Sequence, residues 1–266
     1  MINEKINTQE QHTGNSADVV ISVKGLHKSF GKDLLTGKAS NDVLKGVDLI
    51  VKKSENLVVL GKSGSGKSVV IKCLVGLVEA DKGEIKVFDT DISAPDNSTL
   101  NAIRLRIGFL FQNSALYDSM TVRQNLEFPL KRHSKQLSAK EVDETVHAAL
   151  ENVGLVEAID KMPAELSGGM RKRIGLARTL ILKPEIMLYD EPTTGLDSIT
   201  SREISELILS IQKKNKTSSI IITHDMACAK LTGDRIVILK DGVIVAEGSY
   251  EALEKSDDEW VRSFFI

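Results

Sequence analysis

A glycine-rich octet follows a short apolar run early in the chain. The octet, Gly61-Lys62-Ser63-Gly64-Ser65-Gly66-Lys67-Ser68, matches the phosphate-binding loop pattern G-x-x-x-x-G-K-[ST]. Glycines let backbone N–H groups approach a polyphosphate closely, and a helix that begins near Lys67 points its positive end at the same anion. We expect Lys67 to bridge the β- and γ-phosphates of a nucleotide and Ser68 to hold Mg²⁺. The alternative is a strand-to-helix turn that binds no ligand.

A second apolar run ends in two carboxylates. Residues 186–189 are typical of a buried strand, and Asp190 and Glu191 follow directly. Such a strand places Asp190 beside the metal ion that Ser68 holds. Glu191 can then act as a general base on the attacking water. An acidic pair at a strand end is common on protein surfaces, but the upstream phosphate loop favours the catalytic interpretation.

A third segment combines small residues with a run of cations. Ser167, Gly168 and Gly169 open an expected helix, so they present a hydroxyl group and unpaired N–H groups to an anion. Taken alone, the segment is an ordinary helix N-cap. The following Arg171-Lys172-Arg173 could bind a lipid headgroup, but a charged, solvated helix face is the favoured interpretation.

Composition and length exclude several classes of protein. At 266 residues and 41% hydrophobic composition, the chain can bury a sizeable core, and a net charge of −2 provides no case for nucleic-acid binding. Cys73 and Cys228 are expected to pack rather than react. Residues 1–18 are polar, lack the apolar stretch of a secretory signal and predict a disordered tail. With no apolar run long enough to span a membrane, we expect a cytoplasmic protein that reaches a membrane through a partner.

The expected elements predict an α/β core with a β appendage. A loop is expected at 31–41, and Asp241-Gly242 is a strong hairpin turn. Helical patterns within about 113–183 predict an inserted helical subdomain, inside a domain at 19–250 that is followed by a tail at 251–266. Strands are expected at 19–23, 43–51, 57–60, 83–88, 106–111, 186–189, 219–223 and 235–239, and helices at 122–130, 139–153 and 169–182.

The motifs occur in the order and at the spacing of the ATPase domain of ABC transporters, which the chain resembles over about 19–248. The resemblance implies a phosphate-loop (RecA-like) core with an antiparallel β subdomain and an inserted α-helical subdomain, and it implies ATP and Mg²⁺ as ligands. The motifs are the phosphate loop, Gln112 at a strand end, Leu166-Ser167-Gly168-Gly169, Asp190-Glu191, Gly195-Leu196-Asp197 and Thr223-His224-Asp225.

The same resemblance implies a role for single residues. Phe30 is similar to the aromatic residue that stacks on adenine, although it could instead be a core residue. Gln112 resembles the residue that senses the γ-phosphate and metal, and His224 resembles the histidine that contacts the γ-phosphate. Asp197 resembles the residue that communicates across a dimer. The implied catalytic residues are Glu191, His224 and Gln112, and the implied metal ligands are Ser68, Gln112 and Asp190.

In this family, the segment Ser167-Gly168-Gly169 binds the nucleotide held by the phosphate loop of the opposite subunit, so the resemblance implies a homodimer. Several further segments of the sequence resemble the Mla (maintenance of lipid asymmetry) branch of the family, which serves lipid transport. That branch implies integral membrane permease subunits on the cytoplasmic face, a lipid-carrier subunit and a small regulatory subunit. The features are Leu-Ser-Gly-Gly-Met-Arg-Lys-Arg, the segments 111–122 and 125–130, and the ending 259–265.

Two further points stay open on the sequence. Met170 stands where the family usually has Gln, which changes the local contact of the signature. Trp260, Phe264 and Phe265 could dock on the second subunit or fold back on their own domain.

Two alternatives to transport predict sequence features that differ from those of this chain. A soluble ABC ATPase acting on DNA or ribosomes would be expected to carry a long coiled coil or a second cassette, and neither is present in the sequence. A regulatory nucleotide binder without turnover would be expected to lack the base at Glu191.

Overall fold

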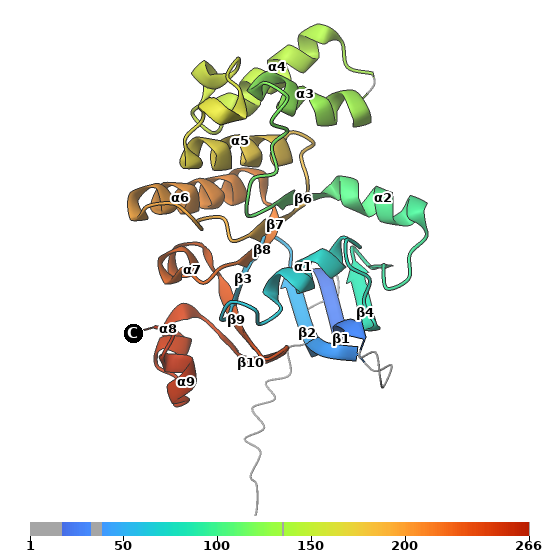
Figure 1. Ribbon diagram of the computed structural model, residues 1–266, viewed down its shortest axis with the longest axis vertical. Coiled ribbons are helices and arrows are strands. Elements are labelled where there is room, and N and C mark those ends of the chain that lie inside the picture. The colour runs from blue at the N-terminus through green and yellow to red at the C-terminus, as the bar shows by residue number, and fades with distance from the viewer. Residues whose placement is uncertain (1–17, 33–38, 135, 266) are drawn as a thin grey trace, which may run out of the picture.

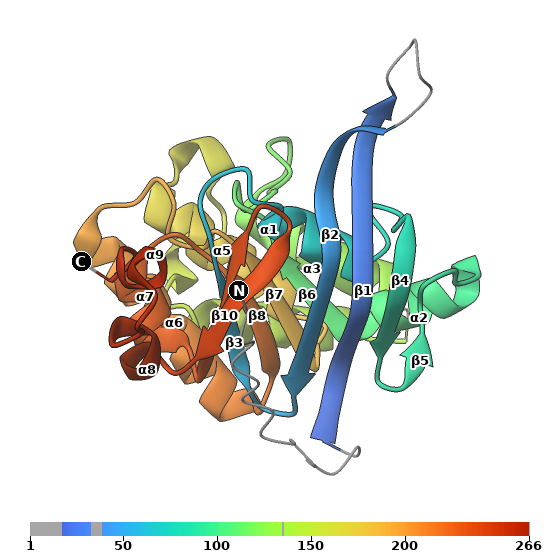
Figure 2. The ribbon, with the colours of Figure 1, turned by 90° about the horizontal axis from the view of Figure 1, so that it is seen from below.

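The computed structural model describes residues 18–32, 39–134 and 136–265, which form two β-sheets with helices around them (Figure 1). The smaller sheet has the strand order β2-β1-β4-β5, and the larger one has the order β10-β9-β3-β8-β7-β6. Figure 2 shows the long strands of the smaller sheet standing beside the larger sheet. This mixed α/β architecture confirms the expected fold class.

The smaller sheet is antiparallel throughout. Its longest pair is β1 (Val19–Lys32) and β2 (Ala39–Lys52), and β4 (Lys82–Val87) and β5 (Thr90–Asp91) extend it. The expected loop at 31–41 is wrong at its ends, because β1 and β2 pair as far as Lys32 and Ala39. The middle of that expected loop, residues 33–38, lies outside the described residues.

The larger sheet is mostly parallel and positions the chemistry. The strands β3 (Asn56–Leu60), β8 (Ser218–Ile222) and β7 (Ile186–Asp190) are buried along their whole length, and β6 (Ile107–Leu110) pairs in parallel with β7. In parallel strands the carboxyl ends meet at one edge of the sheet, where ligands bind in open α/β folds. The phosphate loop, Gln112, Glu191 and His224 all follow such ends and are therefore brought to one edge.

A hairpin closes the other side of this sheet. Strand β9 (Arg235–Lys240) pairs in parallel with β3 and antiparallel with β10 (Val243–Gly248). Between them, Asp241 and Gly242 have φ angles of 48° and 85°. Two successive residues with positive φ are the requirement of the tight hairpin turn expected from the Asp-Gly pair.

Helices cover the sheets in layers (Figure 1). The helices α3, α4 and α5 lie together at one end and share a hydrophobic cluster of their own, built from buried residues between Val122 and Ile181. Helices α6 and α7 pack on the face of the larger sheet with a second cluster. The bounds are α1 (Lys67–Leu74), α2 (Asn97–Arg106), α3 (Val122–His133), α4 (Ala139–Glu151), α5 (Gly168–Leu180), α6 (Ser198–Asn215) and α7 (Met226–Thr232).

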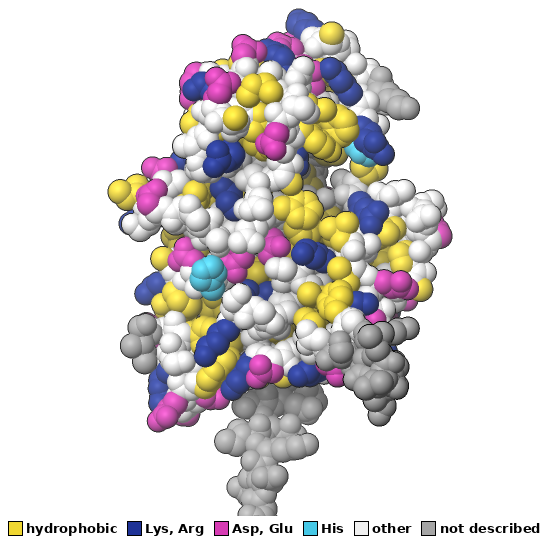
Figure 3. Space-filling model, in the orientation of Figure 1, with side chains coloured by type: hydrophobic (Ala, Val, Ile, Leu, Met, Phe, Trp, Pro, Cys, Tyr) yellow, Lys and Arg dark blue, Asp and Glu magenta, His cyan; other side chains and the backbone are white. Residues whose placement is uncertain are grey.

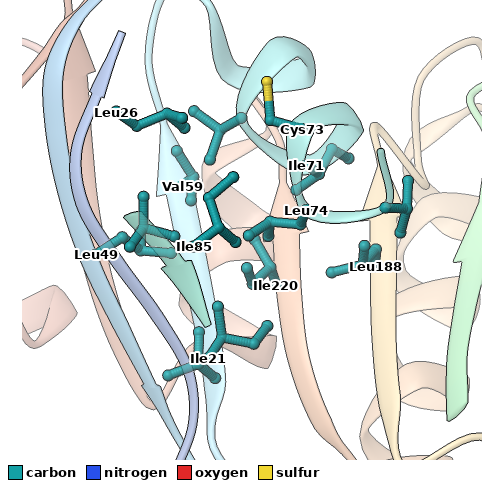
Figure 4. Packing of buried hydrophobic residues seen from close by; sticks show 14 of the residues in the cluster. Ile21, Leu26, Leu49, Val59, Ile71, Cys73, Leu74, Ile85, Leu188 and Ile220 are labelled. Carbon is teal, nitrogen blue, oxygen red and sulfur yellow. The ribbon is translucent and has the colours of Figure 1, made fainter. Parts of the chain in front are cut away.

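The largest cluster joins both sheets to the helix that follows the phosphate loop. Ile71 and Leu74 of α1 are fully buried, and they lie among Val59 and Ile220 of the larger sheet and Ile85 of the smaller one (Figure 4). Burying a large aliphatic side chain stabilises a fold by about 1.5–3 kcal/mol. The start of α1 is therefore held firmly at the edge where the motifs meet.

A buried amide fixes the loop before α3. The side-chain amide of Asn125 donates to the carbonyl groups of Tyr117, Met120 and Thr121, at 3.1, 3.0 and 3.0 Å, and its oxygen accepts from the Tyr117 N–H group at 2.8 Å. Thr121 then begins α3 through a capping box with Gln124. The segment after Gln112 is thus an ordered part of the helical layer.

The C-terminal aromatics pack on their own chain. Helices α8 (Tyr250–Glu254) and α9 (Glu259–Arg262) bring Trp260, Phe264 and Phe265 against the cluster beneath α6 and α7. The ring of Trp260 lies 4.9 Å from that of Phe264, and the Lys240 ammonium lies 4.1 Å from the Trp260 ring centre. This is the fold-back arrangement, one of the two that the sequence left open.

Three further properties bear on function. None of the described helices is both long and apolar enough to cross a membrane. Cys73 and Cys228 are buried, and burial raises the pKa of each thiol to about 11, so both pack as expected. On the face drawn in Figure 3, side chains of both charge signs are interspersed.

Candidate active site

The phosphate loop leaves β3 and enters α1 through glycines that the geometry requires. A Cβ atom at Gly61 would lie 2.5 Å from the Leu239 carbonyl oxygen, and one at Gly66 would lie 2.8 Å from the Leu44 side chain. Gly64 and Gly66 have φ angles of 81° and 102°, in the region that disfavours other residues. The octet therefore forms a tight turn whose N–H groups are available to a phosphate chain.

Lys67 occupies the mouth of this turn. The side chain is 6% exposed, and its Nζ atom donates to the carbonyl oxygens of Gly61 at 2.8 Å and Lys62 at 3.2 Å. It also lies 3.7 Å from Glu191 Oε1. Burial lowers the pKa of Lys67, and the neighbouring Glu191 and Asp190 carboxylates partly offset that effect. A terminal phosphate would supply the compact negative charge that such an ammonium group favours.

Ser68 and Asp190 come together as expected. The Ser68 hydroxyl group donates to Asp190 Oδ1 at 2.6 Å, although the two residues are far apart in the sequence. One hydroxyl and one carboxylate are an incomplete set of oxygen ligands for a metal ion. Among the described residues, no cluster of three or more His, Cys, Asp or Glu side chains could hold a metal without further ligands. Mg²⁺ is typically bound in this way, by one or two protein oxygens together with phosphate oxygens and water. The donor set therefore fits a magnesium nucleotide.

Glu191 is held in an unusual backbone conformation next to a histidine. Its φ angle is 52°, in the left-handed region, and its N–H group donates to the Ile222 carbonyl at 2.9 Å. Glu191 Oε2 lies 2.7 Å from His224 Nδ1 and accepts from the Thr194 hydroxyl at 3.1 Å. The Glu191 side chain is 12% exposed and that of His224 is 62% exposed. The carboxylate is thus oriented by neighbours, while the histidine is open to a ligand.

Lys172 contradicts the interpretation of residues 171–173 as a solvated face. It is 5% exposed, and its Nζ atom donates to the Gln112 carbonyl at 2.5 Å and the Glu191 carbonyl at 3.1 Å. Burial lowers its pKa to about 8. A run of three cations in the sequence does not show which of them points inward, because that depends on where α5 lies against the sheet.

Gln112 and Phe30 are both exposed at the surface. Gln112 lies two residues after the end of β6, and its carbonyl accepts a hydrogen bond from Lys172 while the residue is exposed to solvent. Phe30 is 41% exposed at the end of β1, with the Lys28 ammonium 5.4 Å from its ring centre. An aromatic ring with that exposure is not a core residue, so the core alternative for Phe30 is wrong.

The signature segment begins α5, beside the start of α6. Ser167 caps α5 by accepting from the Met170 N–H group at 3.2 Å. A Cβ atom at Gly169 would lie 2.6 Å from Thr200 Cγ2, and Asp197 caps α6 by accepting from the Thr200 N–H group at 3.0 Å. Within the described ranges, no hydrogen bond joins residues 167–169 to the phosphate loop.

A large cavity lies elsewhere in the molecule. It measures about 980 Å³ and is bordered by parts of β1, α4, α5 and α6. None of the residues expected to bind the nucleotide lines this cavity. The site is therefore identified by its side-chain chemistry at the sheet edge and not by cavity volume, as suits a site that is completed by a second surface.

Comparisons with known proteins agree with this geometry. The ABC transporter family profile matches residues 44–194. A relative from Mycobacterium leprae, the probable ribonucleotide transport ATP-binding protein mkl, is 40% identical over 92% of this chain and 68% of its own length. The Arabidopsis thaliana chloroplast protein TRIGALACTOSYLDIACYLGLYCEROL 3 is 36% identical over 96% of this chain and 76% of its own length. The match spans about two thirds of the mycobacterial relatives, 66% in Mycobacterium tuberculosis.

Solved structures show the same fold. The dimeric ATP-binding cassette MJ0796, in a post-hydrolysis state bound to ADP and Pi, superposes with a TM-score of 0.78 at 31% identity, over 86% of this chain and 98% of that one. The cbiO1 protein from Clostridium perfringens, part of the ABC transporter complex cbiONQ, has a TM-score of 0.77 at 28% identity, over 87% of this chain and 89% of that one.

Proposed function

Because this chain belongs to the ABC transporter family as an ATP-binding subunit that hydrolyses ATP, we propose that it powers a lipid transporter of the Mla type as a homodimer. One observation carries the proposal of mechanism: at one sheet edge Ser68 contacts Asp190, and the next residue, Glu191, contacts both His224 and Lys67.

The chemistry follows from what each group can do. Phosphoryl transfer is catalysed mainly by positioning and by stabilising charge. Lys67 and the N–H groups of the phosphate loop bind the terminal phosphates, and Ser68 with Asp190 holds Mg²⁺. Glu191 takes the proton from the attacking water. His224, hydrogen-bonded to Glu191 and largely exposed, contacts the γ-phosphate. When bound, the metal ion stabilises negative charge on the phosphates.

The nucleotide is bound between two copies of the chain. Ser167, Gly168 and Gly169 offer N–H groups at the start of α5, and no hydrogen bond joins them to their own phosphate loop within the described residues. A partner's nucleotide, held in its own phosphate loop, suits these groups. ATP that touches both copies favours the closed dimer through its higher affinity for that state, and hydrolysis lets the dimer reopen. Gln112 senses the γ-phosphate and metal, and Asp197 lies where the two half-sites communicate.

The lipid substrate rests on the sequence around the signature and on one relative. The motif Leu-Ser-Gly-Gly-Met-Arg-Lys-Arg resembles that of the Mla branch, and the Arabidopsis relative bears the name of a glycolipid. The implied partners are permease subunits in the membrane, with the chain on their cytoplasmic face, together with a lipid-carrier subunit and a small regulatory subunit.

A different transported molecule is the second candidate. Relatives named for ribonucleotide transport and for methionine import are 40% and 36% identical to this chain, so family membership alone does not decide the substrate. The test is to purify the tagged chain from gently solubilised membranes and to analyse the bound molecules by lipid mass spectrometry. We expect a membrane protein and enriched phospholipid. Recovery of a permease without lipid enrichment would favour the second candidate, and recovery of a free ATPase would contradict both.

A further inference from the structure

We propose that Lys172 is a positioning residue for ATP hydrolysis, which ties helix α5 to the backbone of both Gln112 and Glu191. The inference deepens the function proposed above and rests on the dimer described there. Lys172 itself touches no reacting atom, and it acts through the two residues that it holds.

The contacts of Lys172 are specific. The residue is only 5% exposed, and the two acceptors of its ammonium group are the main-chain carbonyl oxygens of Gln112 and Glu191 at 2.5 and 3.1 Å. No carboxylate forms an ion pair with it in the part of the chain that the structure describes, although the charges of Asp190 and Glu191 attract it from a longer range. A buried ammonium group is costly, and it persists where hydrogen bonds satisfy it. Here those bonds go to the two segments that carry the chemistry.

The backbone at Glu191, and that shortly after Gln112, adopts conformations that need support. Glu191 has a φ angle of 52°, and Ser114 and Ala115, just after Gln112, have angles of 58° and 47°. Left-handed conformations at residues other than glycine are strained and persist when surrounding contacts fix them. A hydrogen bond to the Glu191 carbonyl fixes the peptide group next to its Cα atom. The direction of the Glu191 carboxylate therefore depends on Lys172.

The position of Lys172 on its helix gives this contact a further consequence. Lys172 lies within the first turns of α5, which begins at the signature segment Ser167–Gly169. A displacement of the signature onto the partner's nucleotide moves α5, and the ammonium group transmits that displacement to Gln112 and Glu191. Each half-site therefore orients its own base when it engages the nucleotide of the other half-site.

The test compares Lys172→Met with Arg173→Met in the full-length chain. Methionine keeps most of the buried apolar stem but removes the ammonium group. Arg173 is the matched control, because it also donates to a carbonyl, that of Val153 at 3.2 Å, and pairs with Glu203, away from the site. For each variant, the measurements are kcat, affinity for a fluorescent ATP analogue, melting temperature and the lifetime of the ATP-dependent dimer by light scattering.

We expect Lys172→Met to lower kcat by about 10²-fold, the loss that a small misplacement of reacting groups can cause. Nucleotide affinity should stay within about threefold of wild type, since binding groups common to ground and transition state remain. The ATP-dependent dimer should persist longer than in wild type, because it forms but hydrolyses slowly. Lys172→Gln, with a shorter donor, should fall between wild type and Lys172→Met, and Arg173→Met should resemble wild type.

The inference would be overturned by wild-type kcat and dimer lifetime in Lys172→Met. It would also be overturned by a joint loss of melting temperature, nucleotide affinity and dimer formation, which would mark Lys172 as structural only. An absence of ATP-dependent dimers in the wild-type chain would instead contradict the function on which the inference rests, and would overturn it too.

Discussion

At the scale of single residues, Glu191 is the group whose surroundings are best explained by chemistry. Its carboxylate meets an exposed histidine, a threonine hydroxyl group and, at 3.7 Å, the Lys67 ammonium group. Its backbone is strained and held in place. A carboxylate needed only for solubility would require none of these contacts. The arrangement suits a base that must point at one water molecule.

Replacing Glu191 by Gln tests that role. The amide keeps the size and the hydrogen bonds of the side chain but cannot accept a proton at neutral pH. We expect ATP binding to be retained and hydrolysis to fall by at least about 10²-fold, the usual contribution of a general base. Single-turnover assays and titration with a fluorescent ATP analogue measure the two effects. Unchanged turnover would remove Glu191 from the mechanism.

Replacing Lys67 by Ala tests the phosphate contact. The substitution removes the ammonium group from the mouth of the loop, and we expect nucleotide affinity to fall by about 10-fold or more, as for a charge-assisted contact worth about 1.5–3 kcal/mol. Lys72→Ala in the last turn of the same helix is the control. Equal affinities for the two variants in a fluorescence titration would contradict the assignment.

The metal pair is tested through the concentration of Mg²⁺ that hydrolysis needs. Asp190→Asn keeps an oxygen that can accept from Ser68 but removes the negative charge that attracts the cation. We expect the half-maximal Mg²⁺ concentration to rise by about 10-fold, since hard cations prefer charged oxygen ligands. Chelation with EDTA should stop wild-type turnover, and excess Mg²⁺ should restore it. A turnover rate that EDTA does not change would exclude a role for the metal ion in hydrolysis.

At the scale of elements, the contact between the starts of α5 and α6 sets the position of the signature. Gly169 has no room for a side chain, because a Cβ atom would lie 2.6 Å from Thr200 Cγ2. Overpacking of this kind typically costs about 1–3 kcal/mol. The Thr200 hydroxyl group is also needed, since it donates to Asp197 at 2.7 Å.

A double substitution separates that packing from ligand binding. Gly169→Ala should lower the melting temperature, and adding Thr200→Ser should restore it, because serine removes the clashing methyl group and keeps the hydroxyl. Hydrolysis should stay low in the double variant if Gly169 approaches a partner's nucleotide, where a methyl group obstructs the phosphates. Calorimetry measures the melting temperature, and an ATPase assay measures hydrolysis. Recovery of both together would show that Gly169 serves packing alone.

Elements also show how far sequence reasoning reached. Strands β3, β7 and β8 were predicted almost to the residue, because fully buried parallel strands are continuous apolar runs. Helices α2, α6, α7, α8 and α9 were missed. All but α6 are short, and α2 buries only Ile103, so periodicity is weak there. Strands β1 and β2 extend beyond their predicted ends, since pairing between neighbouring strands sets strand length as much as residue type does.

Site residues that belong to sequence motifs were predicted, whereas a residue that only tertiary contacts bring to the site was missed. The two motifs predicted Asp190 beside a metal ion held by Ser68, and the structure brings these two side chains within 2.6 Å of each other. The inward turn of Lys172 depends on where α5 sits above the ends of β6 and β7, and no local pattern records that placement. Three adjacent cations look alike in a sequence until a neighbouring sheet selects one.

At the scale of the whole molecule, the described residues form three hydrophobic clusters, each of which packs a different part of the fold. One unites the sheets and α1, one lies under α6, α7 and the C-terminal helices and includes Leu176 of α5, and one is built from α3–α5 and the segments between them. Since α5 carries the signature and shares the third cluster with α3 and α4, we expect the helical layer to move as a unit during the ATP cycle. The hydrogen bonds of Lys172 join that layer to the catalytic edge.

The C-terminal segment offers a test at this scale. Trp260 and Phe265 pack against the cluster under α6 and α7, with the ring of Phe265 5.0 Å from that of Tyr250. Removing residues 257–266 exposes this surface, and a loss of about 2 kcal/mol is expected from one large apolar side chain. That loss would lower the melting temperature by about 4–8 °C in a protein of this size.

The segment should contribute stability and leave the ATP-dependent dimer intact, because its aromatics already contact their own chain. Light scattering with and without ATP, beside calorimetry, measures both properties. Trp260→Ala is the milder companion, and it should cause part of the same fall in melting temperature by removing the Phe264 and Lys240 contacts. An unchanged melting temperature with loss of the dimer would instead mean that the aromatics act mainly on the second subunit.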